Sequence, residues 1–194
     1  MSDVDGREQD RVSGNRARTD IRLAGSGGQG VVLAGVILAE AALLSGQNVA
    51  ASQAYGPESR GGASRCDVVI GASIGFPVAE ALDVLVVLNR DAYQRHAADL
   101  RDRGLLLADE RRVGRVAAGP WRARSLPIEA TAERVAGNPI AANMVALGAL
   151  AGLTGVVEEE ALAQAVRARV PARTQDMNLR ALRAGFGVSR AEGS

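Results

Sequence analysis

The chain has 194 residues, and its 23 basic and 22 acidic side chains give a formal net charge of +1. This balance argues against electrostatic capture of nucleic acid or of an anionic membrane, and an aromatic content of 3% argues against a surface on which bases stack. Every basic residue is arginine, which excludes chemistry that needs a P-loop lysine or a lysine Schiff base.

The cysteine content excludes several further classes of protein. With Cys66 as its single cysteine, the chain can form no internal disulfide and cannot by itself hold an iron–sulfur cluster or a cysteine-rich zinc site. Its first twenty residues are polar and carry both charges, unlike a signal peptide, and no membrane-spanning apolar stretch follows. We therefore expect a cytoplasmic protein with no membrane partner.

The pattern along the chain predicts one α/β domain. Residues 1–19 have almost no apolar side chains and are expected to form a flexible tail, whereas residues 20–190 are expected to fold as a single domain. Its first half is predicted to contain strands at Ile21–Ala24, Asn48–Gln53, Ser64–Ala72, Asp83–Leu88 and Gly104–Ala108, with helices at Gly30–Ser45 and Arg90–Arg103. The opening strand, helix and strand make a βαβ unit.

The second half is predicted to be mainly helical. A strand at Trp121–Ile128 brings the sheet to five or six strands, and the helices that follow are expected at Glu129–Ala136, Pro139–Leu153, Glu158–Arg169 and Met177–Gly185. Two helical segments, Val31–Leu44 and Ile140–Leu153, have hardly any face suited to water. A chain of this size cannot easily bury two such helices, so we expect it to be a subunit of a larger assembly.

The glycine-rich run of residues 25–30 stands between the first strand and the first helix. Its members are Gly25, Ser26, Gly27, Gly28, Gln29 and Gly30. Without Cβ atoms, the backbone N–H groups at a helix start can approach an anion, which predicts a phosphate-binding turn. A tight turn with a purely structural role would show the same spacing.

A second polar loop, residues 54–64, follows the second strand and is expected at the same carboxyl edge of the sheet. It contains Tyr55, Ser59, Arg60, Gly61, Gly62 and Ser64. A guanidinium, adjacent glycines and hydroxyls suit phosphate oxygens, and the alternatives for Arg60 are a solvated loop residue or a pair with Glu58 or with a partner chain. A nicotinamide site would need an acid at the end of the second strand, where the sequence has Ser52, Gln53 and Ala54.

Together these motifs resemble those of the gamma subunit of 2-oxoacid:ferredoxin oxidoreductases. The resemblance rests on the GSGGQGV run of residues 25–31, on YGPESRGG at residues 55–62, and on Asn138-Pro139, Asn143 and Leu147-Gly148. It implies a Rossmann-like or flavodoxin-like three-layer αβα sandwich with a mostly parallel sheet and a helical C-terminal third. It also implies a complex that converts a 2-oxoacid and CoA to acyl-CoA and CO₂, with 2-oxoglutarate weakly favoured.

The resemblance further implies that this subunit binds or closes over coenzyme A. Thiamine diphosphate, Mg and the iron–sulfur clusters belong to the partner subunits, and ferredoxin or another acceptor takes the electrons. The proposed CoA-binding residues are Gly25, Ser26, Gly27, Gly28, Gln29, Gly30, Tyr55, Ser59, Arg60, Gly61, Gly62 and Ser64, and none is proposed as an acid, base or nucleophile. Two alternatives stay open: an assembly scaffold of the same complex that never holds CoA, and a free-standing NAD(P)-dependent reductase.

Four other residues are expected to have structural roles. His96 is expected to be a surface or half-buried histidine and Cys66 a small buried hydrophobe, with no metal site proposed for either. Asn138 precedes Pro139 as a helix cap would, and Asn143 must find a hydrogen-bond partner if it is buried. Contact with a neighbouring subunit is the alternative for both asparagines.

Overall fold

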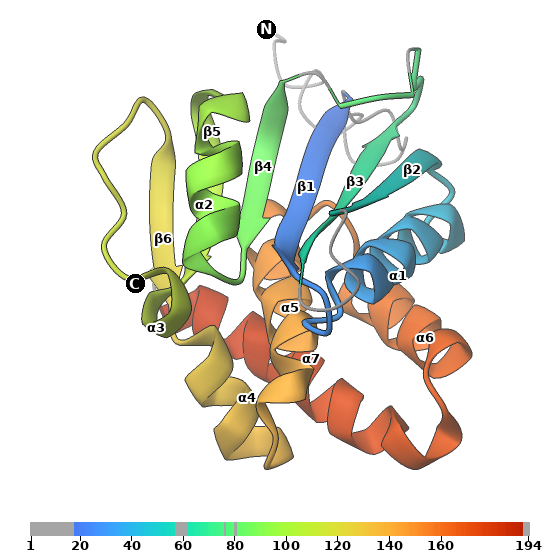
Figure 1. Cartoon of the computed structure of the whole chain (residues 1–194). Helices are drawn as coiled ribbons and strands as arrows, with labels where there is room; N and C mark the ends of the chain where they lie inside the picture. The colour runs from blue at the N-terminus through green and yellow to red at the C-terminus, as the bar shows by residue number, and fades with distance from the viewer. Residues whose placement is uncertain (1–17, 57–61, 76, 80, 192–194) are drawn as a thin grey trace, which may run out of the picture.

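A computed structural model of the chain describes residues 18–56, 62–75, 77–79 and 81–191, arranged around a six-stranded sheet (Figure 1). The strands are β1 (Thr19–Ser26), β2 (Asn48–Tyr55), β3 (Ala63–Gly71), β4 (Leu82–Val87), β5 (Leu100–Asp109) and β6 (Arg122–Leu126). Their spatial order is β2-β3-β1-β4-β5-β6. The expected tail, residues 1–19, lies outside the described residues apart from Arg18 and Thr19, and Thr19 already belongs to β1.

The direction of the strands confirms the mostly parallel sheet. β1, β4, β5 and β6 pair in parallel, whereas β3 is antiparallel to both β1 and β2. Five strands therefore point one way and β3 alone is reversed. Helix α1 (Val31–Leu44) connects β1 to β2 as expected, but β3 lies between these two strands. The chain turns back after β2, so the connection from β2 to β3 meets the end of β1 at one edge of the sheet.

Helices cover both faces of the sheet, and they do so unequally. One face carries α1, α4 (Ile128–Ala136), α5 (Ala142–Thr154), α6 (Glu159–Arg169) and α7 (Ala172–Ala191), which share the larger core. The other face carries the short elements α2 (Arg90–His96), η2 (Ala97–Asp99) and α3 (Glu110–Val113) over a smaller core. On this second face no described helix covers β2 and β3 (Figure 1), and Ser52 of β2 is exposed.

Helix α5 is buried by the chain's own elements. Nine consecutive residues, from Asn143 to Ala151, are buried, which explains why the sequence shows no water-facing side here. Helix α7 packs directly on α5, and an added Cβ on Gly148 would lie 2.1 Å from the carbonyl oxygen of Leu182. Exposed apolar side chains occur at one end of each predicted segment: Leu43 (60% accessible) and Leu44 (47%) in α1, and Ile140 (58%) just before α5. The argument for a larger assembly therefore holds for α1 and for Ile140, but not for α5 itself.

Several predicted boundaries are wrong in an informative way. The helix expected at Arg90–Arg103 ends at His96, a short 3₁₀ turn reaches Asp99, and β5 already starts at Leu100. Leu100 is buried opposite Leu82, and Arg101 forms ion pairs with Asp20 and Asp83, so tertiary contacts override the helical spacing.

The C-terminal helices also differ in their ends. The segment expected at Pro139–Leu153 starts with a 3₁₀ turn, η3 (Pro139–Ala141), before α5 begins. The last helix, expected at Met177–Gly185, extends over Ala172–Ala191, and its C-terminal extension carries Phe186 and Val188 into the larger core. No helix among the described residues is both long enough and apolar enough to cross a bilayer.

The close packing of α5 on α7 provides a matched test of stability. In Gly185→Ala the new Cβ would lie 2.1 Å from the carbonyl oxygen of Val145, so the two helices must separate, at a cost of about 1–3 kcal/mol. Gly187, two residues further along α7, has nothing within 4 Å of an added Cβ. Gly187→Ala should therefore be neutral or stabilising by up to about 1 kcal/mol. Denaturant unfolding of both variants is the measurement, and equal stability would contradict the packing.

Candidate functional site

The glycine turn lies between the end of β1 and the start of α1. Gly30 is the N-cap residue of α1 with φ 70°, and Gly28 has φ 92°, so both occupy conformations that favour glycine. Gly27 and Gly28 are exposed, whereas Gly25 is buried within β1. The predicted order of strand, glycine turn and helix is thus present, with the turn open to solvent at its tip.

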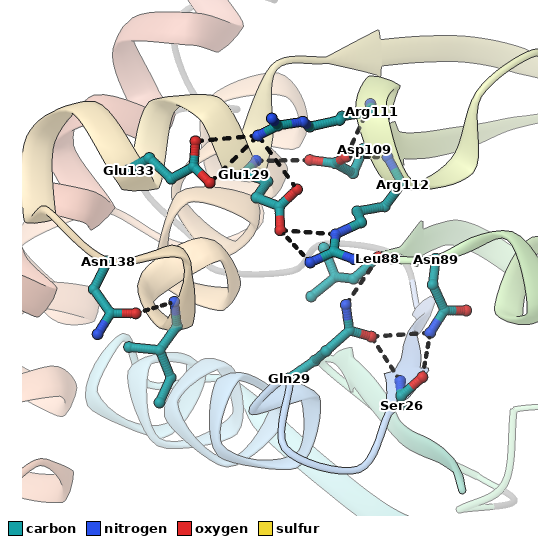
Figure 2. A network of polar contacts seen from close by, with 11 residues as sticks. Ser26, Gln29, Leu88, Asn89, Asp109, Arg111, Arg112, Glu129, Glu133 and Asn138 are labelled. Atoms are coloured by element: carbon teal, nitrogen blue, oxygen red, sulfur yellow. Dashed lines mark hydrogen bonds and ion pairs between the residues drawn. The ribbon is translucent and has the colours of Figure 1, made fainter. Parts of the chain in front are cut away.

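Gln29 fixes the shape of this turn from within (Figure 2). Its Oε1 accepts hydrogen bonds from the Ser26 N–H at 2.7 Å and from Asn89 Nδ2 at 2.9 Å. Its Nε2 donates to the carbonyl oxygen of Leu88 at 3.0 Å. Asn89 also donates to Ser26 Oγ at 2.6 Å and caps α2 by accepting from the Ala92 N–H. The turn is therefore tied to the carboxyl end of β4 by neutral side chains.

The second predicted loop meets the first. The Gly27 N–H donates to the carbonyl oxygen of Gly62 at 2.7 Å, and Ser64 pairs with Gly25 on one side and with Tyr55 on the other. Residues 57–61, which include the predicted Ser59, Arg60 and Gly61, lie outside the described residues. The described parts of both loops thus share the carboxyl edge of β1 and β2, as the sequence predicted.

The hydrogen bonds leave only part of the turn available to an anion. The N–H groups of Ser26, Gly27 and Gln29 are bonded to Gln29, Gly62 and Ser26 respectively. Within the described part of the chain, the N–H groups of Gly28 and Gly30 have no such acceptor. Since both lie at the positive end of the α1 dipole, they are the donors that the turn can offer to a ligand.

One hollow, the acidic hollow, opens on the α4 side of the turn and has a volume of about 260 Å³. The residues that define it are Gly28, Gln29, Asp109, Arg112, Glu129 and Asn138. Figure 2 shows how its charged groups neutralise one another: Arg112 pairs with Glu129 at 2.6 Å, and Asp109 accepts from the backbone N–H of Glu129 at 2.6 Å. The lining holds two carboxylates and one guanidinium, and the guanidinium of Arg111 lies 3.9 Å from Glu129.

A second hollow, the basic hollow, lies on the opposite side of the turn and has a volume of about 190 Å³. The residues that define it are Gly25, Tyr55, Ser64, Arg65, Arg95 and His96. No acidic side chain occurs among the described residues that line it. The structure therefore divides the predicted site: Gly25, Tyr55 and Ser64 face one hollow, whereas Gly28 and Gln29 face the other.

Behind the basic hollow, a buried ion pair organises the sheet. Arg22 donates from Nε and Nη2 to the two carboxylate oxygens of Asp67, at 2.6 and 2.8 Å. Its Nη1 pairs with Asp99 at 2.5 Å. His96 lies against this group, with Nδ1 3.4 Å from Asp99 Oδ2. Burial and the positive charge of Arg22 lower the pKa of His96 below its ordinary value of 6.5. His96 is thus a half-buried, neutral neighbour of a structural ion pair.

The remaining sequence predictions on single residues are structural. Cys66 is fully buried against Gly35, and burial raises the pKa of its thiol to about 11, so it is no reactive thiol. Asn138 caps η3 by accepting from the Ile140 N–H at 2.9 Å. Buried Asn143 donates to the carbonyl oxygen of Gly30 at 3.0 Å, which ties α5 to the glycine turn.

Sequence reasoning missed several residues of the site. Asn89 lies two residues after the end of β4, and Asp109 is the last residue of β5. Polar residues at carboxyl strand ends are a signal that could have identified both. Arg112 and Glu129, by contrast, are 17 residues apart, and no local pattern predicts their pairing. Arg65 and Arg95 come from β3 and α2, which meet only because β3 inserts beside β1.

Comparison with known proteins adds a second line of evidence. Residues 20–188 match the family model described as pyruvate ferredoxin/flavodoxin oxidoreductase. The chain is 39% identical over 179 residues to the 2-oxoglutarate synthase subunit KorC of Methanocaldococcus jannaschii, an alignment that covers 90% of this chain and 96% of KorC.

Two solved structures share the fold. The gamma subunit of keto/oxoacid ferredoxin oxidoreductase from Geobacter sulfurreducens superposes with a TM-score of 0.80 at 41% identity, over 89% of this chain and 99% of that one. The 2-oxoglutarate:ferredoxin oxidoreductase from Magnetococcus marinus, solved with 2-oxoglutarate, coenzyme A and succinyl-CoA bound, gives 0.82 over 91% of this chain and 32% of that one. At 23% identity, the second likeness concerns the fold alone. The predicted flavodoxin-like α/β fold is confirmed.

The role of Gln29 can be tested by truncation. Gln29→Ala leaves the Ser26 N–H and the Leu88 carbonyl without their partners, which should lower the free energy of unfolding by about 1–3 kcal/mol. Gln53→Ala is the matched control, since Gln53 is exposed on β2 and should change stability by less than about 0.5 kcal/mol. Urea denaturation of the two variants is the measurement. A Gln29 variant as stable as the control would show that the turn keeps its shape without the hydrogen bonds of Gln29.

The environment of His96 predicts a pH effect of defined sign. Because the folded pKa lies below 6.5, the unfolded chain binds the proton first as the pH falls. The contribution of neutral His96 to stability is therefore complete above pH 6.5 and declines below that value. Since this is the only histidine of the chain, NMR titration reads its pKa directly. Asp99→Asn should lower that pKa further, and a folded pKa above 6.5 would contradict the geometry.

Proposed function

We infer that this chain, which belongs to the pyruvate ferredoxin/flavodoxin oxidoreductase family, is the gamma subunit of a 2-oxoacid:ferredoxin oxidoreductase. The observation that carries this inference is the alignment with KorC, which spans 96% of that subunit and not merely a shared domain. The fold supports it, because the Geobacter gamma subunit is covered over 99% of its length. The chain is therefore an accessory subunit of an oxidoreductase complex.

Within this complex we propose that the chain binds or closes over coenzyme A. Three features fit the ligand: the free N–H groups of Gly28 and Gly30, the exposed tip of the turn, and the guanidinium groups of the basic hollow. None of these groups is an acid, base or nucleophile for the reaction. The chain would position the thiol carrier while the reaction proceeds on its partner subunits.

The reaction would be the oxidative decarboxylation of a 2-oxoacid, in which CoA takes the acyl group, CO₂ is released and ferredoxin or another acceptor takes the electrons. Thiamine diphosphate with Mg and the iron–sulfur clusters would be held by the partner subunits. KorC of Methanocaldococcus jannaschii belongs to a 2-oxoglutarate synthase, so 2-oxoglutarate is the substrate that we favour. A cytoplasmic location agrees with this role.

Two alternatives are weaker. In a scaffold that never holds CoA, water would bond the free amides of the exposed turn, and substitutions there would leave CoA kinetics unchanged. In an NAD(P)-dependent reductase, the strand beside β1 ends in an acid that holds the ribose. Here β3 separates β1 from β2, so the end of β2, which would carry the acid, lies one strand further from the glycine turn.

Substitution at Gly28 tests CoA binding in the assembled complex. Gly28→Leu places a side chain at the exposed turn between the two hollows and should raise the KM for CoA about tenfold or more. Gly46→Leu is the control, because Gly46 has a similar positive φ of 73° and open space around it, yet lies at the far end of α1. The co-purified complex should be assayed for CoA-dependent ferredoxin reduction with several 2-oxoacids.

We expect 2-oxoglutarate to give the highest kcat/KM and the Gly46 variant to match the unmodified complex. Equal effects of both substitutions would mean that backbone strain, and not blocked ligand access, causes the loss. An unchanged KM in the Gly28 variant would favour the scaffold.

A further inference from the structure

We propose that the acidic N-terminal segment of this chain, residues 1–10, docks as an extended strand along the outer edge of β6. The segment lies outside the described residues and outside residues 20–188, which match the family model. This contact would be independent of coenzyme A and of the proposed function. Three observations support it: the arginines at the β6 edge, the charge of the segment, and the length of chain that connects the two.

Three exposed arginines lie at this free edge of the sheet. Among the described strands β6 pairs only with β5, so its outer side is open to a further strand (Figure 1). Arg122 and Arg124 are exposed on β6, and Arg103 is exposed on the neighbouring β5. Within the described part of the chain none of the three forms an ion pair, and neither does the adjacent Asp102. We call Arg103, Arg122 and Arg124 the basic edge.

Arg103 has an unusual backbone conformation. With φ 63°, it is the one non-glycine residue of the described chain that has a positive φ. Such a conformation is strained for an L-residue and persists only where the surrounding structure holds it. Here the Arg103 N–H donates to the carbonyl oxygen of Pro120 at 2.8 Å, and the Arg103 carbonyl oxygen accepts from Arg122 Nε at 3.2 Å. The two arginines are thus held side by side at the amino end of β6.

The N-terminal segment has the opposite charge. Residues 1–10 contain one basic and four acidic side chains, namely Arg7, Asp3, Asp5, Glu8 and Asp10. Asp3 and Asp5 are two residues apart and would lie on one face of an extended chain, as Arg122 and Arg124 do on β6. Opposite charges that face each other across two strands attract. The other edge strand, β2, has no charged residue and offers the segment no such attraction.

The connecting chain is long enough for this contact. In the order β1-β4-β5-β6 the basic edge lies three strands from β1, which is about 14 Å at a strand spacing of about 4.8 Å. Residues 11–17 can span up to about 23 Å when extended. Because β1, β4, β5 and β6 are parallel, the amino ends of β1 and β6 lie at the same edge of the sheet. A segment that arrives from β1 would therefore enter beside Arg122 and run antiparallel to β6.

Paramagnetic NMR on the full chain tests this docking. A nitroxide can be attached to Ser2→Cys alone, because the native Cys66 is fully buried and its thiol pKa is raised to about 11. The label should broaden the amide signals of β6 (Arg122–Leu126) and leave those of β2 (Asn48–Tyr55) sharp. Salt at about 1 M, where the Debye length is about 3 Å, should reduce this broadening.

Paired substitutions test the role of charge. Arg122→Gln with Arg124→Gln should lower the docking equilibrium constant about two- to thirtyfold, since each exposed ion pair contributes modestly. The matched control is Arg167→Gln with Arg173→Gln, which removes the same charge from two exposed positions on α6 and α7. It should leave the broadening of β6 unchanged.

Three results would overturn the proposal. In the first, the β6 signals stay sharp, which would leave the basic edge to some other acidic chain. In the second, β2 is broadened as strongly as β6, or the broadening survives loss of both β6 arginines. The third requires a mixture of nitroxide-labelled chains with unlabelled ¹⁵N chains. Broadening of β6 in that mixture as strong as within the labelled chain would show that a second copy supplies the segment.

Discussion

The reversal of β3 is the constraint on which the rest of the site depends. By running antiparallel between β1 and β2, this strand brings the connection after β2 back to the end of β1, where the Gly27 N–H bonds to the Gly62 carbonyl at 2.7 Å. Ala63, at the start of β3, pairs with Ser26 at the end of β1, so the residue before this strand lies directly beside the turn. The joining of the two loops is therefore a consequence of strand order and not of the loop sequences alone.

The same strand order creates the asymmetry of charge around the turn. Helix α1 leaves β1 toward one face and α2 leaves β4 toward the other, so a crevice opens between them at the carboxyl edge. Carboxylates from the ends of β5 and the start of α4 gather on one side of the glycine turn. Arginines from β3 and α2 gather on the other side. A turn held by neutral side chains separates them, so each hollow keeps its own electrostatic character.

Much of the fold and about half of the site can be predicted from the sequence. The predictable features are those that depend on residues close together in the chain. The order of strand, glycine turn and helix at residues 21–44 is fixed by glycine conformation and apolar spacing, both local, and it is present as predicted. The helix end near His96 was mispredicted because the burial of Leu100 against Leu82 depends on tertiary contacts. The pairing of Arg112 with Glu129 and the approach of Arg65 to Arg95 require the three-dimensional arrangement, which no spacing encodes.

The chemistry of the described side chains indicates that this chain positions a ligand and does not transform it. The groups that could act as acid or base are engaged or unsuited: Asp109 and Glu129 bind backbone amides or arginine, and the pKa of Cys66 is raised to about 11. His96, with its lowered pKa, is neutral near pH 7 but is held against Arg22 and Asp99. What the site offers instead is fixed hydrogen-bond donors and guanidinium charge at a rigid edge of a sheet. Holding a long, flexible thiol carrier in one orientation lowers the entropic part of the barrier for a reaction that takes place on neighbouring subunits.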